Sequence, residues 1–168
     1  MTQSDKDITE KHCGLVAIVG RPNVGKSTLL NHLLGQKISI TSRKPQTTRH
    51  RLLGIKTTDK AQIVFVDTPG LHLGVDKALN RYMNKTVSSV IKDVDLILFM
   101  IDAGKWTPED EKVLENIRNS STPVFLIMNK IDRINEKEHL LPFMGKLMAI
   151  YEFDEIIPIS ALKSKGID

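Results

Sequence analysis

A glycine-rich segment, residues 20–27, limits this chain to a narrow set of folds. Its sequence is GRPNVGKS, and it follows a short β-branched run, residues 14–20, typical of a strand buried on both faces. The leucines of residues 26–34 then recur at helical spacing, up to Gly35, which is a natural helix end. A strand, a G-x-x-x-x-G-K-S segment and a helix in this order predict a P-loop nucleotide-binding fold of the α/β class.

The chemistry of this segment is the capture of phosphate. Successive backbone N–H groups and the positive end of a helix dipole suit an anion, and Gly20 and Gly25 allow close approach. Lys26 is expected to reach the β- and γ-phosphates, and the Ser27 hydroxyl is expected to bind Mg²⁺. The alternative is a chance glycine loop with an exposed lysine. The candidate nucleotide-binding residues of this segment are Gly20, Arg21, Pro22, Asn23, Val24, Gly25, Lys26, Ser27 and Thr28.

A second motif, Asp67-Thr-Pro-Gly70, follows another apolar run. A carboxylate at the end of such a strand typically holds Mg²⁺, and Gly70 is expected to bring its N–H close to a γ-phosphate. A plain strand-end cap is the alternative for Asp67. Between the two motifs lie the basic residues 36–51, where the hydroxyl of Thr48, or that of Thr47, could complete the magnesium shell. The positive charges of this loop indicate either a solvated surface or a contact for RNA or phosphate.

The segment that points to the base is Asn129-Lys-x-Asp132, at the end of an apolar run and so at the ligand-binding edge of an α/β sheet. The Asp132 carboxylate can accept hydrogen bonds from guanine N1–H and the exocyclic amino group, a donor pair that adenine lacks. Asn129 is expected to meet the O6 and N7 edge of guanine, and the Lys130 stem to pack over the ring. Ser160-Ala161, after the last predicted strand, is expected to offer a backbone N–H to O6. This pattern favours guanine and argues against an ATPase or a nucleotide kinase.

Composition agrees with one globular domain. The chain has 168 residues, of which 40% are hydrophobic and 26% are charged, and its formal net charge is +4. These values favour a packed core, and the charge is too small to indicate a nucleic-acid partner by itself. No apolar run approaches the roughly 18 residues that a membrane helix needs, and residues 1–12 lack the apolar core of a secretory leader. The single cysteine, Cys13, excludes an internal disulfide, so a cytoplasmic protein is expected.

Strand and helix patterns alternate along the chain after an expected flexible tail, residues 1–13. Further strands are expected at residues 51–58, 61–66, 94–101, 123–128 and 156–159. Further helices are expected at residues 76–91, from Thr107 onward, and at 136–150, the last interrupted by Pro142. This alternation predicts a mainly parallel sheet with helices on both faces and one antiparallel edge strand.

These motifs resemble those of the translation-factor-related small GTPases, and most closely those of the bacterial Era family. The resemblance is carried by residues 20–31, 34–44, 46–50 and 67–72, together with Trp106-Thr-Pro108 and Leu140-Leu-Pro142. It implies a three-layer, Ras-like G domain over residues 14–168, with its final helix and a C-terminal KH domain outside the chain. It also implies that the domain binds GTP and GDP with Mg²⁺ and slowly hydrolyses GTP as a molecular switch. In this family the KH domain binds ribosomal RNA during assembly of the small ribosomal subunit, and peripheral contact with the inner membrane is a further expectation.

The expected reaction is in-line attack of water on the γ-phosphate, with Lys26, Thr48 and Asn23 as the candidate catalytic residues. Ras-like enzymes place a glutamine after the glycine of D-x-x-G, whereas this chain has Leu71. By resemblance to related GTPases, Asn23 could ligate a K⁺ ion that bridges the phosphates; alternatively, it braces the loop. Two rival functions stay open: a nucleotide-gated binding module that hydrolysis only resets, and a GTPase of the same broad group that acts in tRNA modification.

Overall fold

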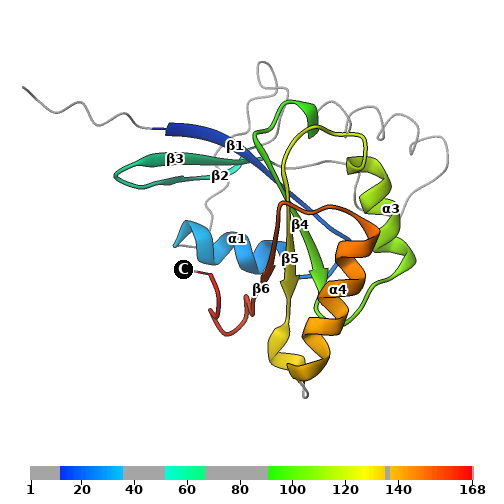
Figure 1. The fold of residues 1–168 in the computed structure, drawn as a ribbon. Helices are drawn as coiled ribbons and strands as arrows, with labels where there is room; N and C mark the ends of the chain where they lie inside the picture. Colours follow the sequence, from blue (N-terminus) through cyan, green and yellow to red (C-terminus); the bar gives the residue numbers. More distant parts are fainter. Residues whose placement is uncertain (1–11, 36–51, 67–90, 135–136, 168) are drawn as a thin grey trace, which may run out of the picture.

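The structure is a computed structural model that describes residues 12–35, 52–66, 91–134 and 137–167. Within these ranges a six-stranded sheet forms the centre of the domain, in the order β2-β3-β1-β4-β5-β6 (Figure 1). β2 pairs antiparallel with β3, and the other neighbouring strands are parallel. The strands are β1 His12–Val19, β2 Leu52–Thr57, β3 Ala61–Val66, β4 Leu96–Asp102, β5 Val124–Asn129 and β6 Glu155–Pro158. The predicted α/β class, with one antiparallel edge strand, is confirmed.

Helices cover both faces of this sheet, so the domain has three layers (Figure 1). The helical elements are α1 Lys26–Leu34, α3 Pro108–Ile117 and α4 Leu140–Ile150, with short 3₁₀ turns η1 Ile131–Arg133 and η2 Lys137–His139. On one face α1 buries Leu29 and Leu30 against the sheet. On the other face α3 buries Leu114 and Ile117, and α4 buries Leu147. The predicted Ras-like arrangement of helices on both faces is confirmed.

The central strand β1 shows how the sequence produces this layering. Its apolar side chains alternate: Ala17 and Val19 belong to the core beneath α3 and α4, whereas Val16 and Ile18 belong to the core beneath α1. All four side chains are buried. A strand with neighbours on both faces has no solvent side, which is why its sequence is uniformly apolar.

Two predicted boundaries need correction. The tail was expected to reach residue 13, but β1 begins at His12, because His12 and Cys13 pair with Ala61 and Gln62 of β3. Pro142 was expected to interrupt its helix, but α4 begins at Leu140 and contains it. Proline is tolerated there because the N–H groups of the first helical turn have no intrahelical partner.

Two further predictions of secondary structure are confirmed, and two others concern residues outside the described ranges. The capped start of α3 at Thr107 is confirmed, and the hairpin of β2 and β3 lies within one residue of its predicted bounds. The basic loop 36–51 and nearly all of the helix predicted at 76–91 lie outside the described residues. None of the helices in the described ranges combines the length and the apolar character needed to cross a membrane.

The parallel strands bring distant segments to one edge of the sheet. The carboxyl ends of β1, β4, β5 and β6 lie at the same edge because these strands run in the same direction. The glycine-rich loop follows β1, Asn129 ends β5, and Ser160 lies just after β6. This edge is where ligands bind in open α/β sheets.

Candidate nucleotide-binding site

The loop between β1 and α1 has a backbone that requires its glycines. Gly20 has φ 148°, Asn23 has φ 63° and Gly25 has φ 104°. A Cβ on Gly20 would clash with the carbonyl oxygen of Met100 in β4, and a Cβ on Gly25 would clash with the side-chain amide of Asn129 in β5. The loop is therefore pressed against the sheet and shaped by glycines, as the capture of phosphate by backbone groups requires.

The start of α1 fits an anion. Gly25, the N-cap, makes no side-chain capping hydrogen bond, and the first turn contains no acidic residue. A helix N-terminus with no carboxylate in its first turn and no capping side chain suits a negatively charged ligand. Lys26 Nζ donates to the carbonyl oxygens of Gly20 and Arg21, at 2.7 and 2.8 Å, which holds the ammonium within the curve of the loop.

The remaining predicted residues of the loop divide into buried and exposed groups. Val24 is fully buried and packs in the core beneath α1, and Pro22 is half-buried. Asn23, Ser27 and Thr28 are exposed. The Ser27 hydroxyl is an oxygen ligand of the kind Mg²⁺ prefers.

Asn129 joins three segments of the site. Its side chain is 3% exposed, Nδ2 donates to the carbonyl oxygen of Val24 at 2.7 Å, and Oδ1 accepts from the Ala161 N–H at 2.8 Å. The sequence pattern predicts that both Asn129 and the Ala161 N–H face guanine; in the structure, which contains no nucleotide, the Asn129 side chain bonds to the Ala161 N–H and to the loop. A buried amide needs partners inside the protein, so Asn129 holds the loop against the segment after β6.

Asp132 has an exposed carboxylate held by a buried hydroxyl. Ser160 is fully buried and its Oγ donates to Asp132 Oδ1 at 2.5 Å. This hydrogen bond is the main cause that lowers the pKa of Asp132 below its ordinary value. The carboxylate therefore stays ionised and acts as an acceptor, as the pairing with two guanine donors requires.

Lys130 connects the base segment with the loop. It has a left-handed backbone, with φ 68°, and its Nζ donates to the carbonyl oxygen of Asn23 at 2.7 Å. The same Nζ forms an ion pair with Asp102 Oδ1 at 2.7 Å. The lysine stem thus runs between the predicted base and phosphate segments.

Sequence reasoning missed two acidic residues of the site, Asp102 and Asp110. Arg21 Nη2 contacts Asp102 Oδ2 at 2.6 Å, and Arg21 Nε contacts Asp110 Oδ1 at 3.2 Å. The Arg21 side chain therefore pairs with β4 and α3, and within the loop its carbonyl oxygen bonds to Lys26. The position of Asp102 after the apolar run of β4 was a signal that could have placed it at this edge.

These charges alter one another's pKa. Burial alone would raise the pKa of Asp102, but its contacts with Lys130 and Arg21 outweigh burial and hold the pKa below its ordinary value. Burial dominates at Asp110 and raises its pKa, although Thr107 and Arg21 act in the opposite direction. Burial would lower the pKa of Arg21, but the two carboxylates outweigh it and raise the pKa.

The predicted residues on the metal side, Thr48, Asp67 and Gly70, lie outside the described residues. In the part of the chain that the structure describes, there is no group of three or more histidine, cysteine, aspartate or glutamate side chains suited to a metal ion.

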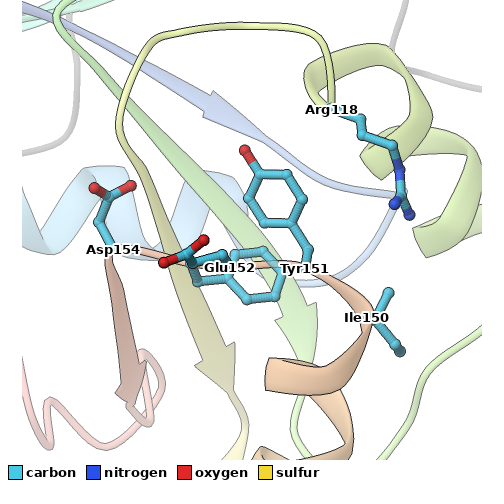
Figure 2. A pocket seen from close by; sticks show the side chains of 6 residues that line it. Arg118, Ile150, Tyr151, Glu152 and Asp154 are labelled. Atoms are coloured by element: carbon cyan, nitrogen blue, oxygen red, sulfur yellow. The ribbon is translucent and has the colours of Figure 1, made fainter.

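A cavity of about 650 Å³ lies elsewhere in the domain (Figure 2). Its lining residues are Arg118, Ile150, Tyr151, Glu152, Phe153 and Asp154. Asp154 accepts a hydrogen bond from the N–H of Val124, the first residue of β5, so the cavity lies at the amino ends of the strands. No residue of the predicted motifs lines it, which leaves the carboxyl edge as the candidate site.

The family model described as "50S ribosome-binding GTPase" matches residues 15–130, from β1 to the lysine after β5. The chain belongs to this GTPase family. The match covers the glycine-rich loop and reaches the base segment, which are the two parts that the structure brings together.

Relatives in this GTPase family give a finer comparison. The chain is 57% identical to GTPase Era of Ectopseudomonas mendocina over 96% of its own length and 54% of the relative. It is 56% identical to GTPase Era of Pseudomonas aeruginosa strain PAO1 over 100% of the chain and 55% of that relative. The chain therefore spans about half the length of these curated relatives. The resemblance to the Era family seen in the motifs is confirmed.

Two solved structures have the same fold. Era in complex with MgGDPNP and nucleotides 1506–1542 of 16S ribosomal RNA matches with a TM-score of 0.77 and 45% identity, over 95% of this chain and 54% of that one. A single-residue variant of Aquifex aeolicus Era bound to GDP·AlF₄⁻ matches with a TM-score of 0.76 and 46% identity, over 94% and 54% respectively.

Proposed function

We propose that this chain is the G domain of an Era-like GTPase, which binds GTP and GDP with Mg²⁺ and slowly hydrolyses GTP to GDP and phosphate as a molecular switch. The observation that carries the proposal is the ionised Asp132 carboxylate, held by Ser160 beside the phosphate-binding loop. Asn129 ties this base segment to the loop through the carbonyl oxygen of Val24. The names of the solved relatives, with MgGDPNP and with GDP·AlF₄⁻, support the same chemistry.

Base recognition is tested by exchanging the hydrogen-bonding groups of Asp132 and of the base. Wild type should bind GDP and GTP and reject ATP. Asp132→Asn should weaken GDP binding about 10- to 100-fold, because a bidentate contact to a base is worth about 1–3 kcal/mol. The variant should gain affinity for xanthosine diphosphate, which carries a carbonyl where guanine has its amino group. Equal binding of ATP and GTP by wild type would contradict the proposal.

On the phosphate side, we assign the β- and γ-phosphates to the loop N–H groups and to Lys26, which already lies within the loop. Mg²⁺ would be held by Ser27 with Thr48 and Asp67, and Gly70 would face the γ-phosphate. When bound, Mg²⁺ neutralises charge on the phosphates. Lys26 holds the phosphate chain in position for attack by water.

The rate of hydrolysis leads to a proposal about Asn23. Leu71 has no hydrogen-bonding group that could orient the attacking water. We therefore propose that the side-chain oxygen of Asn23, which is exposed, would bind a K⁺ ion beside the phosphates. The left-handed backbone at Asn23, with φ 63°, equally suits the alternative that it braces the loop.

The variant Asn23→Gly separates these two roles, because glycine keeps the left-handed backbone and removes the side chain. If K⁺ is ligated, turnover of wild type is faster in K⁺ than in Na⁺ at equal ionic strength, and Asn23→Gly loses this difference while it still binds GDP. Equal rates of wild type in both salts would exclude the K⁺ role.

For partners and location, we propose the small ribosomal subunit and its RNA, through a KH domain C-terminal to this G domain. The solved Era complex with a 16S ribosomal RNA segment supports this proposal. The place of action would be the cytoplasm, with peripheral contact at the inner face of the membrane. Turnover with and without small ribosomal subunits separates a GTPase from a binding module that hydrolysis only resets.

A further inference from the structure

We propose that Asp102 is a positioning residue that keeps the phosphate half and the base half of the nucleotide site in register. It does so through two cations, Arg21 of the loop and Lys130 of the base segment. This inference rests on the proposed function, because it assigns a role within the same site. Asp102 belongs to none of the nucleotide-binding motifs of the sequence.

The first link joins the loop to the sheet and to α3. Arg21 lies between two carboxylates, with Nη2 at 2.6 Å from Asp102 and Nε at 3.2 Å from Asp110. Asp110 is itself fixed, because its Oδ2 accepts from the N–H and the hydroxyl of Thr107, at 2.9 and 2.7 Å. The Arg21 side chain is 11% exposed and that of Asp110 is fully buried, so solvent screens this pair weakly.

The second link joins Asp102 to the base segment. Its other oxygen, Oδ1, pairs with Lys130 Nζ at 2.7 Å, and that ammonium also donates to the carbonyl oxygen of Asn23 at 2.7 Å. Asp102 thus lies between two cations that are both tied to the loop. Arg21 is a residue of the loop, and Lys130 donates a hydrogen bond to the carbonyl oxygen of Asn23. Lys130 in turn immediately precedes η1, which carries Asp132.

The charges explain why one carboxylate can control both halves. Asp102 and Asp110 balance Arg21 and Lys130, and the side chains of Asp102 and Lys130 are each 20% exposed. Removal of the Asp102 charge leaves Asp110 as the one remaining carboxylate of this group of four charges. Asp110 pairs with Arg21, so the Lys130 ammonium loses its ion-pair partner Asp102. Loss of one partner from a largely buried pair is costly, because the remaining charges are uncompensated. The loop and the base segment then lose their common anchor.

The test uses two variants, each with a control from a second ion pair of α3. This exposed pair joins Glu111, in the first turn of the helix, to Arg118, its C-cap, at 3.3 Å, with side chains 39% and 46% exposed respectively. Asp102→Asn is compared with Glu111→Gln, and Arg21→Met with Arg118→Met. For each protein the measurements are the GDP dissociation rate, KM and kcat for GTP, and the melting temperature without nucleotide.

Asp102→Asn should speed GDP dissociation and raise KM about tenfold, equivalent to about 1.4 kcal/mol. Its kcat should stay within about twofold of wild type, because Asp102 acts on binding in the ground and transition states alike. Arg21→Met should give a smaller loss, since the Lys130 link remains. Asp102→Glu, which keeps the charge, should recover most of the affinity. Both controls should match wild type.

Two results would overturn the inference. One is that Asp102→Asn has a lower melting temperature than its control, Glu111→Gln, but the same GDP dissociation rate. A residue with a purely structural role would give this result. The other is a loss of kcat with unchanged KM. If Asp102→Asn does not fold, Arg21→Met and Asp102→Glu decide by the same measurements. Failure of wild type itself to prefer GDP over ATP would instead reject the proposed function.

Discussion

The Asp132 carboxylate is exposed, yet its position depends on Ser160, which is buried shortly after β6. The motif Ser160-Ala161 predicts a backbone N–H donor in the site, whereas in the structure the Ser160 hydroxyl donates to Asp132. A hydrogen bond to the ionised form of an acid lowers its pKa and limits its rotation. The affinity of the site for guanine should therefore depend on a hydroxyl that holds the base-reading carboxylate.

Replacement of Ser160 by alanine should raise the pKa of Asp132 toward the ordinary aspartate value. Because the proposed guanine contact needs the ionised carboxylate, GDP affinity should fall as the pH falls through this pKa, and in Ser160→Ala the fall should begin at a higher pH than in wild type. Carboxyl NMR titration of Asp132 and GDP affinity over the acidic range measure both effects. The neighbouring Ser164→Ala is the control, and an unchanged Asp132 titration in Ser160→Ala would refute the prediction.

The glycines provide a second prediction for single residues. Gly25→Ala should destabilise the domain by about 1–3 kcal/mol, because its φ of 104° is strained for alanine and its Cβ would clash with Asn129. Gly35→Ala shares a positive φ, 72°, but meets nothing within 4 Å, so it isolates the backbone cost. Gly145→Ala, in open space within α4, should stabilise by about 0.5–1 kcal/mol.

Chemical denaturation measures the free energy of unfolding of each glycine variant, and GDP titration measures its affinity. Gly25→Ala should lose both stability and affinity, whereas Gly35→Ala should lose only stability. If both variants lost the same amounts of stability and of GDP affinity, the clash between a Cβ at residue 25 and Asn129 would have no measurable effect.

At the scale of elements, the start of α3 connects helix stability to the nucleotide site. Thr107 and Asp110 form a capping box: the Thr107 hydroxyl oxygen accepts from the Asp110 N–H, and the Asp110 carboxylate accepts from the Thr107 N–H. Pro108 occupies the first position of the helix, where its lack of an N–H costs nothing. The same Asp110 carboxylate contacts Arg21 of the phosphate-binding loop. A change in the cap should therefore also affect the loop.

Thr107→Ala should lower the free energy of unfolding by about 1 kcal/mol, the usual cost of a lost N-cap. For a domain of this size, that loss corresponds to a melting temperature lower by about 2–4 °C. It should also weaken GDP binding slightly, because Asp110 loses the hydroxyl that helps to hold it against Arg21. Calorimetry and GDP titration check both effects. Thr107→Ser, which keeps the hydroxyl, should resemble wild type; an equal loss in both variants would count against the capping role.

For the whole molecule, the sheet order decides which segments meet. β1, β4, β5 and β6 are widely separated in sequence, and their parallel pairing places Arg21, Asp102, Asn129 and Ser160 at one edge. A nucleotide bound there would contact segments from across the chain. Such a ligand binds only the folded state and stabilises the domain as a unit.

GDP with Mg²⁺ at about 100 times its Kd should add about 2.7 kcal/mol of stability, which raises the melting temperature by several degrees. Chelation of Mg²⁺ should remove part of this gain, because the proposed site then lacks the cation that neutralises charge on the phosphates. A thermal melt with GDP, with GDP and a chelator, and with ATP measures the effect. ATP should produce no shift, and a shift as large as that with GDP would contradict guanine selectivity.

The sequence by itself determined the layered α/β architecture and pointed to the glycine-rich loop and the base segment of the candidate site. β-Branched runs, leucines at helical spacing and a threonine cap act over a few residues, so β1, α1 and the start of α3 could be predicted locally. The glycine-rich loop and Asp132 could be predicted because their chemistry needs those residue types in that order.

Only the tertiary structure decided which side chains connect the loop, the base segment and the sheet. The bonds of Asn129 to the loop and to Ala161, and the pairing of Arg21 with Asp102 and Asp110, join residues that lie far apart in sequence. No local pattern specifies such partners, because their proximity depends on the order and direction of the strands. Charged and amide side chains that are buried on folding must form hydrogen bonds or ion pairs with the groups packed beside them. The sheet order decides which groups those are.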